Sequence, residues 1–498
     1  MKKIILSIIA AVSFSLILSS CSDWLTLNPH DAESDETAIT NLGDAQIALN
    51  GVYYMIRTSP LYGREAVVIG DAGTPDVTLK LPNSNRFVNV YNWQNPQPGG
   101  AHFTDVYVRA YRAIDAANKV ILRTEGLSTD TPAEENVKKQ ILGEAHLLRA
   151  LVHFEILKYF SHAYNYTADG SHLGIVYMHE PTITNNHARS TSKESFEYII
   201  EDAKEAVALM TVDSPAEPFS AGSLAAEALL ARVYLYKAGT TGSADFAEAK
   251  IAAEKVINSG KYTLATPAQY TITGTTSFAS PMWLPAAGFS SESILTIPFL
   301  SVATERLYTT ALSRIYLDSN KGYGDLLPSN EIVALMGTDA ADVRNSIFYE
   351  YDYSGVATPC VRKFFGPIDN WDLANYNIFR ISEMYLIAAE AAARAGNDAP
   401  ALVHLNLLKT NRGVATISGL TGQALIDEIL LERRKELCFE GHRLADLKRL
   451  NLGVVRGTDT NNPGNQDYSV AYPDYRFAFP IPTHEMDVNK DMVQNPGY

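Results

Sequence analysis

Two stretches of this sequence share one pattern, and that pattern limits the folds that the chain can adopt. Residues 223–262 and 380–413 each contain a helix rich in small residues, a short turn and a second, alanine-rich helix. Two antiparallel helices approach closely only where small residues lie at their crossing, and each such pair leaves an apolar face that a neighbour must cover. The repetition therefore predicts a stack of helix pairs.

Helical periodicity extends beyond these two stretches. Apolar residues recur at spacings of three and four in 44–58, 103–126 and 134–160, which indicates helices with one buried face. We interpret 134–160 together with 193–210 as a degenerate pair of the same kind. The 34 residues of 380–413 match the length of a tetratricopeptide unit. We therefore predict a mainly α fold built on a tetratricopeptide-like helical-repeat scaffold.

Two long segments interrupt this helical pattern. Between 263 and 378 the sequence is rich in Ser, Thr, Gly, Pro and aromatic residues, and 292–300 alternates like a strand. Eight aromatic residues fall between positions 348 and 376, and a second irregular segment covers 59–100. Segments of this length are usually functional or disordered, and their aromatic content argues against disorder. We predict an irregular, partly β subdomain inserted into the scaffold.

The N-terminus has the features of a secretory leader. Two lysines precede a largely apolar run at 4–18, and two serines lead from it to Cys21. As a helix, these 15 residues would span about 22 Å, short of a hydrocarbon core of about 30 Å. The segment 18–21, Leu-Ser-Ser-Cys, is similar to a bacterial lipobox, whose cysteine is acylated. We predict a lipoprotein signal peptide at 1–20, lipidation of Cys21 and a tether at 21–40; an ordinary signal peptide is the alternative.

The charge balance excludes one class of partner. The formal charge is −15, and loss of residues 1–20 with their two lysines would leave 39 basic residues against 56 acidic ones, or −17. Such a surface repels nucleic acid and anionic lipid headgroups. We therefore expect no nucleic-acid partner. The membrane attachment that we expect is lipid alone, because no later stretch approaches 18 consecutive apolar residues.

Two other cysteines, Cys360 and Cys438, are 78 positions apart. They could pair in an oxidising compartment, but the sequence provides no disulfide framework. Cys438 lies between Leu437 and Phe439 in a strongly helical stretch, which favours a buried free thiol.

The sequence offers little support for catalysis or metal binding. It lacks a G-x-S-x-G nucleophile elbow, a P-loop and an H-E-x-x-H motif. His146 and His153 are seven positions apart, too far to share a metal without outside ligands. Residues 459–464 are similar to part of a calcium loop, but Pro463 occupies a liganding position. We expect no catalytic residues, no metal and no cofactor, although 56 carboxylates leave a glycosidase open.

The most charged stretch, 421–450, reads as one helix. Its glutamates recur every four residues: Glu432, Glu436 and Glu440. They could form an acidic site, but we favour a helix held by local ion pairs such as Glu440–Arg443 and Arg443–Asp446. Gly441 costs about 1 kcal/mol inside a helix, which suggests that another backbone approaches closely there.

Six segments from the first residues of the tether to the C-terminus carry characteristic motifs. They are "CSDWL" (21–25), "IDAANKVI" (114–121), "GYGDLLPSNEIVALM" (322–336), "RISEMYLIAAEA" (380–391), "ILLERRKELCFEGHRLADLKR" (429–449) and "PIPTHEMDVNKDMVQNPGY" (480–498). Together they resemble the motifs of SusD/RagB-like lipoproteins, most specifically in the C-terminal third. The family's ligand sites do not lie in the motif at 429–449, which agrees with a structural role for that helix.

The resemblance implies a function. Such proteins are surface lipoproteins of the Gram-negative outer membrane, with a tetratricopeptide-like scaffold. They bind oligosaccharides or peptides without cleaving them and act as the lid of a SusC-like TonB-dependent transporter. On this basis we expect a helical part at 41–262, a ligand-binding region at 263–378 and C-terminal helices at 379–498.

The resemblance also points to candidate ligand-binding residues in the irregular segments. Tyr323, in "GYG", holds a position where an aromatic can line the site of glycan-binding relatives, and Trp93 occupies a second aromatic-bearing region. Sugar rings stack on aromatic planes, and their hydroxyl groups need polar partners. The complete predicted set is Asp76, Arg86, Tyr91, Trp93, Asn95, Trp283, Tyr323 and Trp371.

Alternatives remain open at this point. Any single aromatic in this set could simply pack in the core. The ligand could be a peptide instead of a glycan, since both kinds of binder share the motifs. A surface glycoside hydrolase and a purely protein-binding tetratricopeptide scaffold are two other classes of protein that remain compatible with this sequence.

Overall fold

The structure is a computed structural model. It describes residues 38–94, 101–182, 184, 186–240, 242–285, 288–299, 311–457 and 468–498. The predicted signal peptide, the lipidation of Cys21, most of the tether and the candidate Asn95 lie outside these residues, as does the calcium-loop-like segment.

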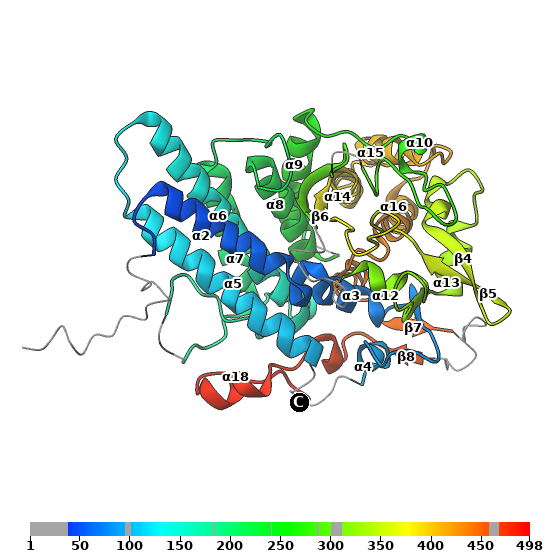
Figure 1. Cartoon of the computed structure of the whole chain (residues 1–498), viewed down its shortest axis with the longest axis horizontal. Coiled ribbons are helices and arrows are strands. Elements are labelled where there is room, and N and C mark those ends of the chain that lie inside the picture. Colours follow the sequence, from blue (N-terminus) through cyan, green and yellow to red (C-terminus); the bar gives the residue numbers. More distant parts are fainter. Residues whose placement is uncertain are drawn as a thin grey trace, which may run out of the picture.

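Helices account for most of the described chain (Figure 1). The longer helices are α2 Leu42–Arg57, α3 Glu65–Ala72, α5 Ala101–Glu125, α6 Pro132–Phe160, α7 Ser192–Leu209, α8 Ser223–Ala238, α9 Ser243–Asn258, α14 Ile381–Arg394, α15 Asp398–Asn411 and α16 Gly422–Leu437. The shorter ones are α4 Val88–Tyr91, α10 Pro267–Tyr270, α12 Ser313–Tyr316, α13 Asn330–Met336, α17 Arg443–Arg449 and α18 Thr483–Val488. A π-helical turn, Ser59–Gly63, joins α2 to α3, and 3₁₀ turns lie at Tyr164–Tyr166, Val343–Ile347 and Tyr475–Phe477.

The strands form short antiparallel pairs. They are β1 Val77–Leu79 with β3 Leu326–Pro328, β2 Ser293–Ile297 with β6 Tyr376–Arg380, β4 Phe348–Tyr353 with β5 Val356–Val361, and β7 Val454–Arg456 with β8 Tyr468–Val470. The strand expected within 292–300 is therefore present as β2. It pairs with β6, which leads directly into α14.

The predicted stack of helix pairs is confirmed. α8 packs against α9 and α14 against α15, and these are the two stretches whose small residues predicted a pair. α6 packs against α7, as expected for the degenerate pair, and α9 contacts α14. In Figure 1 the stack runs from α2, α5 and α6 through α8 and α9 to α14 and α16. Buried alanines at the crossings, such as Ala226 in α8 and Ala389 in α14, allow the close approach.

Capping residues fix where the two helices of the degenerate pair begin. Thr131 and Glu134 form a capping box at the start of α6, and Thr191 and Glu194 form another at the start of α7. In each box the threonine side chain accepts a free backbone N–H of the first turn, and the glutamate accepts the N–H of the threonine. These sequence patterns therefore specify the register in which the pair starts.

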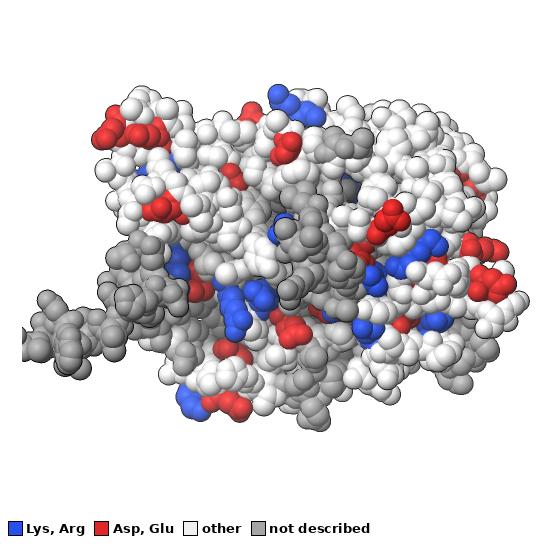
Figure 2. Space-filling model, in the orientation of Figure 1, with Lys and Arg blue, Asp and Glu red and all other residues white. Residues whose placement is uncertain are grey.

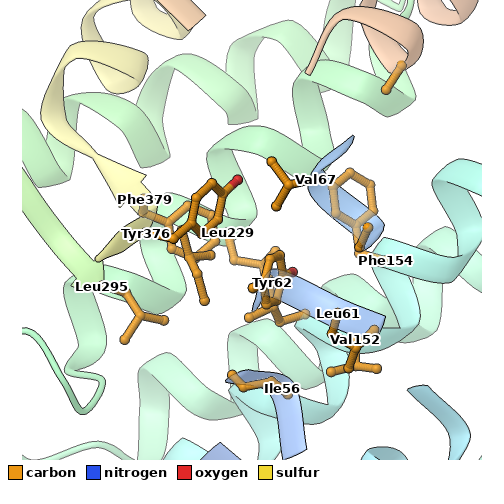
Figure 3. Packing of buried hydrophobic residues seen from close by; sticks show 14 of the residues in the cluster. Ile56, Leu61, Tyr62, Val67, Val152, Phe154, Leu229, Leu295, Tyr376 and Phe379 are labelled. Atoms are coloured by element: carbon orange, nitrogen blue, oxygen red, sulfur yellow. The ribbon is translucent and has the colours of Figure 1, made fainter. Parts of the chain in front are cut away.

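The irregular region shares a core with the helical scaffold. In Figure 3, Tyr62 of the π-helical turn lies between two groups of buried side chains. Leu61 of the same turn and Phe154 of α6 are on one side of it, and Tyr376 of β6 and Leu295 of β2 are on the other. The rings of Tyr62 and Tyr376 stack with centroids 5.9 Å apart. The strands from 263–378 are therefore held against the helices by apolar burial as well as by their own pairing.

The single helix expected over 421–450 is wrong in one respect, because the chain breaks between α16 and α17. Phe439 and Gly441 adopt positive φ angles of 66° and 79°. At Gly441 a Cβ atom would lie 2.9 Å from the carbonyl oxygen of Val67, and at Gly70 it would collide with the Gly441 backbone. The close approach expected at Gly441 is thus present, but it occurs at a helix break.

The glutamates of this stretch are held by ion pairs, as favoured, but the partners differ from those expected. Glu436 accepts hydrogen bonds from Arg412 and Arg380, which come from other elements. Glu440 pairs with Arg380 and Lys363 rather than with Arg443. Burial alone would raise the pKa of Glu436, but the two arginines hold it well below its ordinary value. Arg443 lies 3.7 Å from Asp76 instead of pairing with Glu440 or Asp446, and a local pair forms between Arg449 and Asp446 at 2.7 Å.

The structure also bears on the state of the two remaining cysteines and on membrane-spanning helices. Cys360 and Cys438 are both buried free thiols, and burial raises the pKa of each to about 12. Among the described residues, no helix combines the length and the apolar character needed to cross a membrane.

Candidate functional site

The pairing of β1 with β3 brings the two irregular segments together. Thr78 lies opposite Leu327 in this ladder, although 249 positions separate them in the sequence. Beyond the last pair, the Lys80 N–H donates to the carbonyl oxygen of Asp325 at 3.0 Å. The ladder therefore places the loop around Arg86 beside the "GYG" segment.

Tyr323 is the centre of a half-buried group of aromatic and basic side chains. The guanidinium carbon of Arg86 lies 3.8 Å from the centroid of its ring, and that of Arg314 lies 5.8 Å from it. Both arginines are also fixed by carboxylates. Arg86 is 3.7 Å from Asp325, and Arg314 donates two hydrogen bonds to Asp372, at 2.6 and 2.9 Å.

Trp371 extends the same group. It is half-buried and packs against Phe278 with ring centroids 5.4 Å apart. The ammonium nitrogen of Lys321 lies 5.7 Å from the Trp371 ring and donates to Asp318 at 2.6 Å. We refer to Arg86, Arg314, Lys321, Tyr323 and Trp371 together as the Tyr323 surface. Figure 2 shows Lys and Arg side chains gathered over the part of the molecule where Figure 1 places α12 and α13.

The chemistry of the Tyr323 surface suits recognition of hydroxyl-rich or anionic molecules. Aromatic faces can take the C–H face of a sugar ring, and fixed guanidinium groups donate hydrogen bonds in a defined direction. The carboxylates nearest to these arginines, Asp325 and Asp372, are buried and paired. In the part of the chain that the structure describes, no group of three His, Cys, Asp or Glu side chains is arranged to hold a metal ion.

Three of the predicted residues lie in the interior instead. Trp93 is 4% exposed, and its indole N–H donates to the Gly73 carbonyl at 2.8 Å. Asp76 is fully buried and pairs with Arg434 at 2.5 Å. Trp283 is buried against Tyr270 with ring centroids 5.3 Å apart. In this structure none of the three is presented to a ligand, because each completes the packing or charge balance of the core.

Tyr91 is buried as well, but it lines a cavity. This cavity has a volume of about 140 Å³, and Arg456 of β7 lies on the ring of Tyr91, with the guanidinium carbon 3.8 Å from its centroid. Of the predicted set, the structure therefore brings Arg86, Tyr323 and Trp371 together and places Tyr91 at a separate cavity.

Sequence reasoning missed several residues of these two places. Arg314 and Lys321 belong to the Tyr323 surface, Asp372 holds Arg314 in place, and Arg456 belongs to the cavity. Lys321 directly precedes the "GYG" segment, and this position in the sequence could have indicated that it lies near Tyr323. Arg314 and Asp372 are 58 positions apart and carry no shared motif, so only the fold reveals that they pair.

Comparisons with known proteins agree with this fold. The profile described as "SusD family" matches residues 368–498, and the one described as "Starch-binding associating with outer membrane" matches residues 68–235. The SusD-like protein P2 of Formosa agariphila is 26% identical over 97% of this chain and 98% of its own length.

Two further similarities come from Bacteroides. The starch-binding protein SusD of Bacteroides thetaiotaomicron is 31% identical over 121 residues, which are 24% of this chain and 21% of that protein. The crystal structure of a SusD superfamily protein from Bacteroides vulgatus superimposes with a TM-score of 0.81 at 27% identity, covering 92% of this chain and all of the other. The helical scaffold and the inserted strands are thus shared along nearly the whole length.

Proposed function

Because this chain belongs to the SusD/RagB family, we propose that it binds nutrient oligosaccharides at the outer membrane and does not cleave them. The observation that carries the proposal is the Tyr323 surface, where Tyr323 and Trp371 lie among three basic side chains. One relative, the starch-binding protein SusD, and one matching family are named for starch binding, which supports a glycan over a peptide.

Fixed side chains favour binding at this surface. Asp372 holds the guanidinium of Arg314 through two hydrogen bonds, and Asp325 accepts a hydrogen bond from the Ser84 N–H at 2.9 Å while pairing with Arg86. Side chains that are already ordered lose less conformational entropy when a ligand arrives. A sugar ring would stack on the aromatic faces, and its hydroxyl groups would accept hydrogen bonds from the arginines.

We further propose that lipid on Cys21 attaches the protein to the outer membrane, facing the cell surface, and that a SusC-like TonB-dependent transporter takes up the bound oligosaccharide. Both proposals extend what the family membership implies. Cys21→Ala should release the protein from the membrane fraction while leaving glycan binding unchanged. Co-purification of a β-barrel protein from native membranes would test the partner, and a wild-type protein that never co-purifies with one would contradict it.

Affinity electrophoresis of the mature protein against a panel of glycans and peptides tests the binding proposal. Tyr323→Ala should weaken glycan binding by about tenfold or more, because a stacked ring and its buried contact are worth about 1.4 kcal/mol or more. Tyr54→Ala is the matched control, since Tyr54 is 58% exposed on α2 and also has an arginine, Arg57, 5.2 Å from its ring centroid.

Several outcomes would contradict this function. Binding of peptides but of no glycan would replace the ligand class. Release of shorter sugars from a polysaccharide, abolished by one carboxylate substitution, would make the protein a hydrolase. Equal glycan binding by the wild type, Tyr323→Ala and Trp371→Ala would move the site elsewhere.

A further inference from the structure

Arg456 is a buried arginine without a carboxylate partner among the described residues. It is 7% exposed, and its Nε and Nη1 atoms are buried without a hydrogen-bond acceptor in that part of the chain. Its guanidinium carbon lies 3.8 Å from the ring centroid of Tyr91 and 4.8 Å from that of Tyr468. Burial lowers the pKa of Arg456, but arginine remains charged at neutral pH. Buried donors that lack an acceptor are costly, so an incoming acceptor is favoured here.

The guanidinium lines the cavity of about 140 Å³ beside the β1–β3 ladder. The other lining residues are Pro75, Val77, Thr78, Tyr91, Ser329, Asn330, Glu331 and Gly457. The volume equals that of roughly four or five water molecules, which is enough for a carboxylate or a sulfate group. We call this place the Arg456 cavity.

Glu331, the carboxylate among the residues that line the cavity, is already paired. Its partner Arg434 lies 2.7 Å away and also pairs with Asp76 at 2.5 Å. Arg456 is the other charged lining residue, and it has no carboxylate partner among the described residues. A negatively charged group in the cavity would give Arg456 the partner that it lacks, whereas a positively charged one would be repelled by it.

The Arg456 cavity lies close to the Tyr323 surface. The ladder runs from Val77 opposite Pro328 to Leu79 opposite Leu326, with the cavity at the first end and the Arg86–Asp325 pair beyond the second. At about 3.3 Å per strand residue, the two places are roughly 10 Å apart along the ladder. In Figure 1, β7, β8 and α4 lie at the same end of the molecule as α12. The separation along the ladder is short enough for one oligosaccharide to span.

We propose that the Arg456 cavity is a subsite for an anionic substituent, a carboxylate or a sulfate ester, on the oligosaccharide that the Tyr323 surface binds. The proposal rests on the function proposed above and narrows its substrate class to acidic glycans. Arginine donates two parallel hydrogen bonds to such an oxyanion, and these charge-assisted bonds are stronger than those to a neutral hydroxyl group. Stacking on Tyr91 and Tyr468 keeps the guanidinium plane in place for this interaction.

A matched pair of ligands tests the proposal on the wild-type protein. Titration calorimetry would compare oligogalacturonate with its methyl ester, and a sulfated galactan oligosaccharide with its desulfated form. We expect at least one charged ligand to bind about ten- to a hundredfold more tightly than its neutral partner, as a charge-assisted hydrogen bond predicts. The two pairs also distinguish a carboxylate from a sulfate ester. This comparison does not depend on whether any variant folds.

The variants then assign the preference to Arg456. Arg456→Gln should remove most of the difference between the affinities for charged and neutral ligands, while Arg456→Lys should keep part of the difference. Tyr323→Ala should weaken both ligands of a pair equally. Tight glycan binding by the wild type without any preference for the charged forms would overturn the inference and leave the proposed function standing. Binding of acidic peptides and of no glycan would overturn both.

Discussion

The buried arginines around the C-terminal helices differ from Arg456 in one respect. Arg380 and Arg412 are nearly inaccessible, and each contacts Glu436 and Glu292. Arg449 pairs with Glu390 at 2.7 Å. Arg456 is similarly buried, yet among the described residues it meets two tyrosine rings and no carboxylate.

This difference separates charges that hold the fold from one that is available for binding. A buried ion pair with both partners present contributes to a specific structure, and removing one partner leaves an uncompensated charge. A buried charge without a partner makes no such contribution to the folded structure. The expected cost of a substitution in free energy of unfolding therefore differs sharply between the two regions, and stability measurements test the distinction.

The largest effect is expected for Glu436→Gln. The substitution leaves Arg380 and Arg412 with less compensation inside the core, and we expect the free energy of unfolding to fall by about 3–5 kcal/mol. Urea unfolding followed by circular dichroism would measure it. Glu428→Gln is the control on the same helix, because Glu428 pairs with Lys409 and its side chain is 22% exposed, so its loss should cost less than about 1 kcal/mol. Equal losses in both variants would contradict the comparison.

The stabilities of the wild type and of Glu436→Gln should also depend differently on pH in acid. Arg412 and Arg380 hold the pKa of Glu436 well below its ordinary value of 4.5 despite burial. A depressed folded-state pKa contributes stability that is fully present well above pH 4.5 and is lost as the pH falls from there toward the folded-state pKa. The stability advantage of the wild type over Glu436→Gln should therefore be largest at neutral pH and shrink in acid. A difference that stays constant down to pH 3 would show that Glu436 contributes through packing alone.

A smaller effect is expected at Gly441, which joins the two regions. Its N–H donates to Asp71 at 2.6 Å, and the break turns Arg443 toward Asp76 at the edge of the Arg456 cavity. Gly441→Ala should cost about 2–3 kcal/mol, because the positive φ is strained for alanine and the Val67 backbone is too close to a Cβ atom. Gly355→Ala has a positive φ of 89° with open space around it, so it should cost only about 1 kcal/mol. If the two costs were equal, the close approach would have no energetic weight.

The sequence allowed the helical pairs to be predicted because their signals are local. Small residues, apolar spacing and the capping boxes of α6 and α7 all lie within the segments that they specify. The β1–β3 ladder could not be predicted, since its strands are distant in the sequence and only three residues long. The ladder decides which irregular segments form the candidate site.

The individual site residues show the same limit. An aromatic residue packs equally well in a core or under a ligand, and composition does not distinguish the two. Trp93 and Trp283 therefore became core residues, while Tyr323 and Trp371 remained half-buried near the surface. Arg456 had no motif at all. Its lack of an acceptor follows only from the three-dimensional arrangement of the residues around its guanidinium.

The smallest effect on stability is expected for Arg456→Met. The substitution removes buried donors that lack acceptors and replaces them with an apolar chain of similar length, while it loses the contacts of the cation with Tyr91 and Tyr468. These terms oppose each other at about 1 kcal/mol each, so the midpoint of thermal unfolding should stay within a few degrees of the wild type or rise. Arg449→Met is the matched control, because it abandons Glu390 and should lower the midpoint clearly. A strong loss of stability in Arg456→Met would mean that this arginine, like the others, supports the fold, and would remove the distinction between the two regions.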